Sequence, residues 1–286
     1  MTEFIDGDTK TRHAVADHMI DLCADLLDNP EIQDATNGLA KEARSLLDLL
    51  YVPNKRDGYH RISGKKFEGH GIPLIVTMPG ERAKVRRLAK YALHPLQEER
   101  LQGVFADHGI DTSEEEYTEM LEGIKTRYKE YYGNTFKGIN DDGSWIAYVY
   151  APTSDVRLRT GQRNKKVRYM VNSSPAVFMR SNIGEVDDAG DLLFHELIHV
   201  QQCLTRIIYR SRDTQKDLYR NELEAYSNAA IAQSIHYNVD IDENPLEFHH
   251  MYVESIRRRI NADNDDPYAV TDELLAALKQ AGRTLN

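Results

Sequence analysis

Two histidines and a glutamate occur at a spacing that suits metal chemistry. They belong to the segment His195-Glu196-Leu197-Ile198-His199, which lies within a run of helical periodicity. At a separation of four residues the histidines project from one helix face, one turn apart, so both can reach the same Zn²⁺ at about 2.0–2.1 Å. Glu196 lies at the edge of that face, where its carboxylate can take a proton from a metal-bound water. The segment therefore predicts a zinc site with a general base beside it.

A third protein ligand is needed, because catalytic zinc sites usually have three. Glu222 lies 23 residues after His199 in a second helical segment, which leaves room for the first helix to end, turn and return antiparallel. Glu222, Ala225 and Ala229 share one face of that segment, and the small alanines allow a close approach. Glu224 is the competing ligand, about 200° around the helix from Glu222. We predict that Glu222 completes the site.

The helix that carries the histidines has two contrasting faces. The apolar face predicts contact with the core, and the polar face predicts one wall of a wet cleft. The apolar stripe consists of Leu193, Leu197, Val200, Leu204 and Ile207, and the polar stripe of Asp191, His195, His199, Gln202 and Arg206.

Residues 191–230 resemble the gluzincins, the thermolysin-like clan of zinc peptidases whose third ligand is a glutamate on the following helix. Asn221-Glu222-Leu223-Glu224-Ala225 looks like their Asn-Glu-x-x-Ser/Ala element, which assigns the ligand to Glu222. The letters of His195–His199 are also similar to the motif of clostridial neurotoxin light chains. The resemblance implies one Zn²⁺ per chain and a protein or peptide substrate. It also implies hydrolysis by a zinc-activated water, with Glu196 as general base.

The chain departs from the clan at Tyr226. Thermolysin-like enzymes carry an aspartate at this position, four residues after the ligand glutamate, which orients the first histidine. Here Asp191 or a backbone carbonyl would have to orient His195. The clan also uses a tyrosine, histidine or arginine to hydrogen-bond the oxyanion. For that role we predict Tyr226 and His250, ahead of Tyr219, His236, His249, Tyr252 and Arg257.

The elements that must position this site are predicted from apolar periodicity and turn residues. Two helices occupy the first fifty residues, separated at Asn29-Pro30. In related enzymes an edge strand before the active-site helix pairs with extended substrate, and 166–171 is the candidate, with an ordinary sheet strand as the alternative. The prediction is an α+β fold, predominantly helical and zincin-like, with a small mixed sheet preceding the active-site helix. Strands are expected at 72–78, 145–150 and 166–171, and helices at 81–93, 113–131, 187–210, 214–237, 245–262 and 270–282.

Length and composition favour one large domain or two modest ones. We predict a helical N-terminal region at 1–110, with a short β and loop insert, for recognition or regulation, and a catalytic domain at 111–286. The net charge of −10 over 286 residues argues against a nucleic-acid partner. No apolar run is long enough to cross a bilayer, and the acidic N-terminus lacks a Sec signal. Cys23 and Cys203 are expected as thiols in a reducing compartment. The chain is therefore predicted to be cytoplasmic, or exported by a signal-less route.

Three other functions remain open at this stage. The site could be catalytically inactive, so that zinc stabilises a scaffold whose N-terminal helices bind a partner. The chain could be a self-processing or regulatory protease controlled by its first ~110 residues, a size within that of a small folding unit. It could also be a secreted effector or toxin with the same chemistry and a selective substrate.

Overall fold

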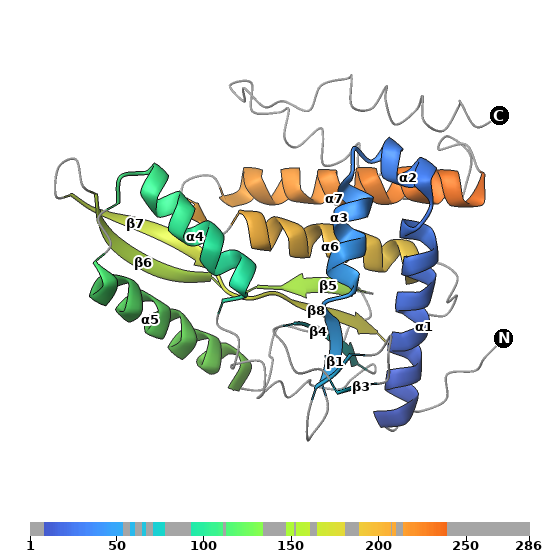
Figure 1. Ribbon diagram of the computed structural model, residues 1–286, viewed down its shortest axis with the longest axis horizontal. Coiled ribbons are helices and arrows are strands. Elements are labelled where there is room, and N and C mark those ends of the chain that lie inside the picture. Colours follow the sequence, from blue (N-terminus) through green and yellow to red (C-terminus); the bar gives the residue numbers. More distant parts are fainter. Residues whose placement is uncertain are drawn as a thin grey trace. The chain divides into compact units, whose positions relative to one another are not determined.

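In the computed structural model, the described residues of the chain form helices and two β-sheets, joined by turns and loops (Figure 1). The described residues are 9–53, 58–60, 65–66, 71–77, 93–110, 113–133, 147–151, 153–160, 165–180, 189–206, 208–209 and 214–238.

The chain forms two compact units, each built from three segments. Unit 1 comprises Met1–Asp17, Leu49–Gly184 and Val200–Arg212, and it contains both sheets. Unit 2 comprises His18–Asp48, Glu185–His199 and Asp213–Asn286, and its described residues are helical or in turns and loops. The predicted division into a recognition or regulatory region at 1–110 and a catalytic domain at 111–286 stays a prediction.

The larger sheet of unit 1 has six strands in the order β3-β2-β1-β4-β8-β5. Parallel pairing joins β1 to β4 and β4 to β8, whereas the outer pairs are antiparallel, so the sheet is mixed. Tyr148 lies opposite Phe178 in the register, and their rings stack with centroids 5.0 Å apart. The strands are β1 (Leu50–Pro53), β2 (Gly58–His60), β3 (Lys65–Lys66), β4 (Ile72–Thr77), β5 (Ala147–Tyr150) and β8 (Ala176–Arg180).

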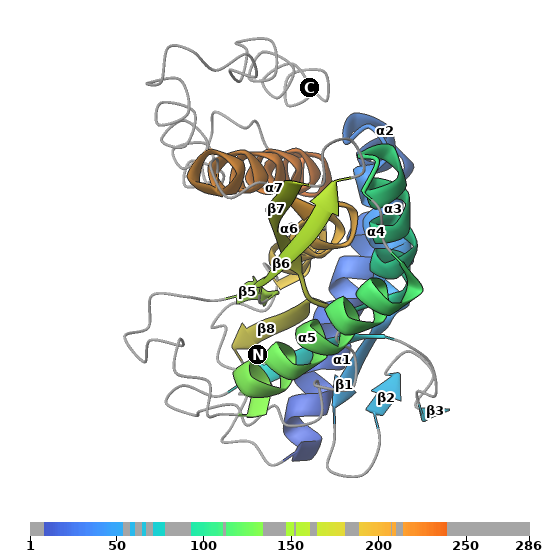
Figure 2. The same ribbon diagram turned by 90° about the vertical axis from the view of Figure 1, so that its left-hand side faces the viewer.

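A second, three-stranded sheet of unit 1 has the order β6-β7-β9 and is antiparallel. Its strands are β6 (Thr153–Thr160), β7 (Lys165–Asn172) and β9 (Ile208–Tyr209). Helices α4 (Pro95–Asp107) and α5 (Glu114–Gly133) lie beside β6 and β7 (Figures 1 and 2). Alternate strand residues face these helices, and the shared core includes Leu101, Phe105, Met120, Ile124, Val156, Leu158, Tyr169 and Val171.

Gln97 joins three parts of unit 1 at the start of α4. Its side chain is fully buried, and its Oε1 accepts a hydrogen bond from the His94 N–H at 2.9 Å. Its Nε2 donates to the carbonyls of Ser173 and Cys203, each at 3.1 Å. Because the His94 ring in turn accepts from the Leu96 N–H, the same residues cap the helix.

The described residues of unit 2 belong mainly to five helices, of which α1 begins in unit 1 and α6 ends there. Asn29 caps α2 by accepting from the Glu31 N–H at 2.9 Å, and Pro30 occupies the first helical turn. Gly38, with a φ of 84°, makes the left-handed turn between α2 and α3. The helices are α1 (Thr9–Leu27), α2 (Pro30–Ala35), α3 (Leu39–Leu47), α6 (Ala189–Thr205) and α7 (Thr214–Tyr237).

Most predicted elements that fall on described residues are present. The break at Asn29-Pro30, the strands near 72–78, 145–150 and 166–171, and the helices at 113–131 and 214–237 are confirmed. The first fifty residues contain three helices instead of the predicted two, because positive φ angles at Asn37 and Gly38 separate α2 from α3. The helix predicted over 187–210 ends at Thr205, because Ile208-Tyr209 pairs with β7 as β9. The helices expected at 245–262 and 270–282, and nearly all of 81–93, lie outside the described residues.

Both cysteines lack a disulfide, as predicted. Over the described part of the chain, no helix combines the length and the apolar character needed to cross a membrane.

Candidate metal centre

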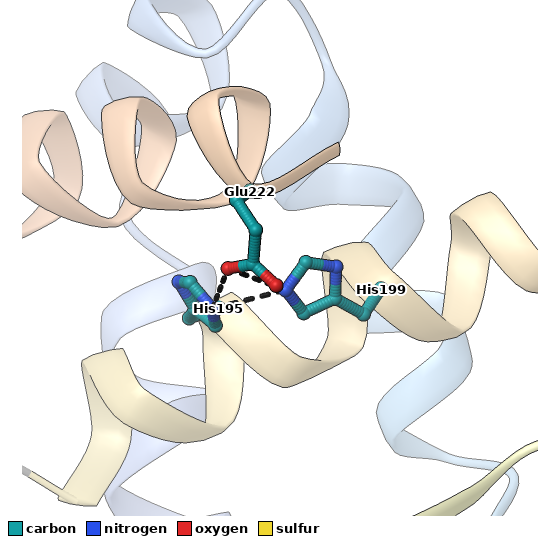
Figure 3. A group of neighbouring side chains, drawn as sticks. All are labelled: His195, His199 and Glu222. Atoms are coloured by element: carbon teal, nitrogen blue, oxygen red, sulfur yellow. Dashed lines mark hydrogen bonds and ion pairs between the residues drawn. The ribbon is translucent and has the colours of Figure 1, made fainter. Parts of the chain in front are cut away.

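The histidine motif and the predicted third ligand come together in unit 2. His195 and His199 lie on successive turns of α6, and Glu222 projects toward both from α7 (Figure 3). Ala225 and Ala229, which share a face with Glu222, are buried, as expected for a helix in close contact with its neighbour. Among the described residues, His195, His199 and Glu222 are the one group whose ligand atoms all lie within 4.8 Å of one another. Glu224 is not part of it.

The three ligand atoms form a nearly equilateral triangle. The Nε2 atoms of the two histidines are 3.0 Å apart. The Glu222 Oε2 atom lies 3.4 Å from the His199 Nε2 and 3.7 Å from the His195 Nε2. Three ligands of a tetrahedral zinc, each about 2.0–2.1 Å from the ion, are about 3.4 Å apart. The observed triangle therefore has the size that such an ion requires, and the two nitrogens and one carboxylate oxygen are the donors that zinc prefers.

The polar face of α6 is more enclosed than the sequence predicts. Asp191, His195 and Gln202 are buried, with exposed fractions of 4%, 6% and 5%, whereas His199 is partly exposed and Arg206 is exposed. The predicted wall of a wet cleft stays a prediction. The described residues of the apolar stripe, Leu193, Leu197, Val200 and Leu204, are buried as predicted, and Ile207 lies outside the described residues. On the apolar side of α6, the backbone of Leu22 and Cys23 in α1 lies against Gly190. Exposure at the site is greatest at the Glu222 side chain, at 26%, against 14% for that of His199.

Tyr226 contacts the first histidine through its ring. The centroids of the Tyr226 and His195 rings are 4.2 Å apart, with an angle of 63° between the planes. The His195 and His199 rings meet nearly at right angles, with centroids 4.7 Å apart. Tyr226 thus restrains the orientation of the His195 ring by packing, at the position where the resemblance leads one to expect an aspartate. Its predicted role at an oxyanion stays a prediction.

The other predicted site residues have different outcomes. Glu196 is buried, with an exposed fraction of 4%, and it lies outside the triangle of ligand atoms. Asp191 is buried one turn before His195, and its predicted role in orienting that ring stays a prediction. His250 lies outside the described residues, as do His249, Tyr252 and Arg257. His236 is exposed near the end of α7.

The strand expected to pair with substrate is not an edge strand. β7 pairs with β6 along its whole length and with β9 at Met170 and Val171, so it is the central strand of its sheet. The prediction that 166–171 offers an open edge is therefore wrong, and the alternative, an ordinary sheet strand, is correct. The preceding strand, β6, occupies the edge.

The chain matches no protein-family model, no curated protein and no solved structure.

Proposed function

We propose that the chain is a zinc-dependent peptidase in which His195, His199 and Glu222 hold one Zn²⁺ and Glu196 is the general base. The observation that carries the proposal is the triangle of ligand atoms, with sides of 3.0, 3.4 and 3.7 Å. Two helices supply these atoms from residues distant in sequence, and the small side chains of Ala225 and Ala229 support their close approach. The motif spacing and the geometry therefore favour the same ligand set.

A zinc ion held by His195, His199 and Glu222 would supply Lewis acidity and would lower the pKa of a bound water to about 7. The carboxylate of Glu196 would accept a proton from the attacking water and transfer it to the amine nitrogen as the peptide C–N bond breaks. Tyr226 would keep the His195 ring in a fixed orientation throughout, because the two rings are in contact. His195 and His199 would remain neutral ligands.

A structural zinc site is the second candidate, because the burial of His195 and Glu196 favours it. Closed zinc sites usually have four protein ligands, however, and the described residues supply three. The two candidates predict the same metal content and differ in the effect of Glu196→Gln, which keeps the size of the side chain but removes its basicity.

Metal content is the first test, measured by elemental mass spectrometry on the purified full chain. We expect about one zinc per chain in the wild type and in Glu196→Gln, and a large loss in His195→Ala and Glu222→Ala, because two ligands bind zinc far more weakly than three. Glu224→Ala is the matched control, since it removes a carboxylate two residues away on the same helix. Full zinc in Glu222→Ala, or little zinc in the wild type, would show that the ligand set is wrong.

Hydrolysis is the second test, with a library of quenched fluorescent peptides and the variants that keep their zinc. The peptidase proposal expects cleavage by the wild type, and a loss on the order of 10²-fold or more in Glu196→Gln, the range of a general base. Cleavage that survives undiminished in Glu196→Gln would refute Glu196 as the base. No cleavage by a fully zinc-loaded wild type would favour the structural site.

A further inference from the structure

Unit 1 contains a groove that the metal centre does not use. It has a volume of about 450 Å³ and lies between α5 and β6. Figures 1 and 2 show this helix and strand side by side. The helix wall consists of Glu116, Glu119, Met120, Gly123, Ile124 and Arg127, which form one stripe along α5.

The groove follows the open edge of β6. A hollow over one face of a strand would be lined by alternate residues, whereas this groove is lined by six consecutive residues, 154–159. Among the described strands β6 pairs only with β7, so its other edge has backbone N–H and C=O groups that no described strand takes up. Such an edge is a template for an additional strand.

The two walls have equal length, which suits an extended chain. Six residues of β6 span about 17 Å. The stripe from Glu116 to Arg127 on α5 also spans about 17 Å, because a helix rises 1.5 Å per residue. A guest of about five or six extended residues would contact both walls along its whole length.

Two features of the walls point to a ligand. Ser154 is 3% exposed, and its hydroxyl has no hydrogen-bond partner among the residues that the structure describes. A buried hydroxyl in this state costs free energy that a polar guest would recover. On the opposite wall, a side chain built at Gly123 would meet nothing within 4 Å, so the space beside the helix is open at its midpoint.

The two faces of β6 differ in charge and polarity. Arg157 and Arg159 are exposed on the outer face, and Arg157 lies directly opposite Arg168 of β7. Asp155, on the same face, is bonded to Arg168, which holds the pKa of that carboxyl below its usual range. The Asp155 carboxylate is therefore already paired with the Arg168 guanidinium. The inner face meets the apolar side chains of Met120 and Ile124.

We infer that this groove binds an extended peptide segment as a fourth strand, paired with the edge of β6, in which acidic and apolar side chains alternate. Acidic side chains of the guest would lie beside Arg157 and Arg159, where opposite charges on neighbouring strands stabilise pairing. The alternate apolar side chains would face Met120, Gly123 and Ile124. Glu116 and Glu119 would disfavour acidic side chains at one end of the helix wall, whereas Arg127 lies at the other end. This site is independent of the proposed peptidase activity.

The test is the binding of a fluorescent hexapeptide, (Glu-Val)₃ with blocked ends, to the full chain by fluorescence anisotropy. We expect saturable binding, and at least a tenfold weaker affinity for (Lys-Val)₃, which places like charges beside the arginines. N-methylation of alternate guest amides should also weaken binding about tenfold or more, because it removes the donors that pair with the edge. No saturable binding up to millimolar protein would overturn the inference, as would equal affinity for the two charge patterns.

Matched variants locate the binding site. Gly123→Leu fills the open space and should weaken binding at least tenfold. Gly103→Leu makes the same change in α4, where a side chain also meets nothing within 4 Å, and should have no effect. The double variant Arg157→Glu and Arg159→Glu should lose (Glu-Val)₃ and gain (Lys-Val)₃, which a misfolded chain would not do. Equal effects of the two glycine variants, or no change of charge preference, would refute the site.

Discussion

The histidine cluster of unit 2 and the Gln97 cluster of unit 1 are both buried and polar, but they are satisfied in opposite ways. Gln97 has complementary partners, with two carbonyls accepting from its amide at 3.1 Å and one N–H donating to it at 2.9 Å. At the other cluster, the Nε2 atoms of His195 and His199 are 3.0 Å apart, in a contact whose donor depends on the ring tautomers, and the Glu222 Oε2 lies 3.4 and 3.7 Å from them. In the proposed zinc-bound state both Nε2 atoms would be unprotonated, and a cation between them and the carboxylate would stabilise the arrangement. The Gln97 amide is thus satisfied within the fold, whereas the second cluster is the one that we propose to bind an ion.

The largest expected difference between the two clusters is the effect of zinc on the free energy of unfolding. A ligand that binds only the folded state adds about 4 kcal/mol to the free energy of unfolding at a thousand times its Kd. We expect zinc to raise the Tm of the wild type and chelation to reverse the increase. His195→Ala should lose this response, measured by calorimetry.

A Gln97 variant provides the control for that experiment, since it should keep the response to zinc while starting from a lower Tm. If the wild type unfolds at the same temperature with zinc and with chelator, the contrast between the two clusters fails.

The Gln97→Leu substitution should have the next largest effect. It removes the donors to Ser173 and Cys203 and leaves their buried carbonyls unsatisfied, which costs about 2–4 kcal/mol in free energy of unfolding. Urea denaturation measures this loss. Glu99→Leu changes an exposed residue of the same helix and should shift stability by less than about 0.5 kcal/mol. A loss below about 1 kcal/mol for Gln97→Leu would mean that water replaces the amide.

The histidine site could be predicted from sequence because its signal is local. Residues four positions apart on a helix lie on the same face, about one turn apart, so His195 and His199 had to share a face. The prediction of Glu222 as the third ligand required only that the next helix run back antiparallel beside the first. The small residues Ala225 and Ala229 indicated which face of that helix makes the contact. The break at Asn29-Pro30 was predictable for the same reason, because the cap and the proline act within one turn.

Contacts between residues that are distant in sequence could not be predicted in this way. Gln97 bonds to residues 76 and 106 positions away, and nothing in its neighbourhood marks it as buried. β6 alternates Ser154, Val156 and Leu158 inward with charged residues outward, a pattern typical of a strand, yet only the register with β7 shows that it lies at an edge. The close contact of α6 with α1 at Gly190 likewise joins residues more than 160 positions apart.

Alanine substitutions at Gly190 of unit 2 and Gly103 of unit 1 should change the free energy of unfolding by smaller amounts and in opposite directions. A Cβ atom at Gly190 would lie 3.0 Å from the Leu22 carbonyl carbon and 3.2 Å from the Cys23 nitrogen, both backbone atoms that cannot move aside. Gly190→Ala should therefore lower the free energy of unfolding by about 1–3 kcal/mol. Gly103→Ala, in open space within α4, should raise it by about 0.5–1 kcal/mol through helix propensity. Chemical denaturation of both variants checks the difference, and the same sign for both would contradict the close approach of α1 to Gly190.

The smallest effect is expected at a polar cluster of unit 2 that is exposed. Arg44 bonds to Asp28 and to Asp48, each at 2.9 Å, but more than half of the surface of each aspartate side chain is accessible to water. Water and salt screen such pairs, so Arg44→Ala should cost less than about 1 kcal/mol in free energy of unfolding. Repeating the measurement in 1 M salt, where the screening length is about 3 Å, should remove most of that cost. A salt-independent loss as large as that of Gln97→Leu would show that the aliphatic part of Arg44, and not its charge, stabilises the packing of α3 against the end of α1. It would also show that exposure does not separate strong polar clusters from weak ones in this protein.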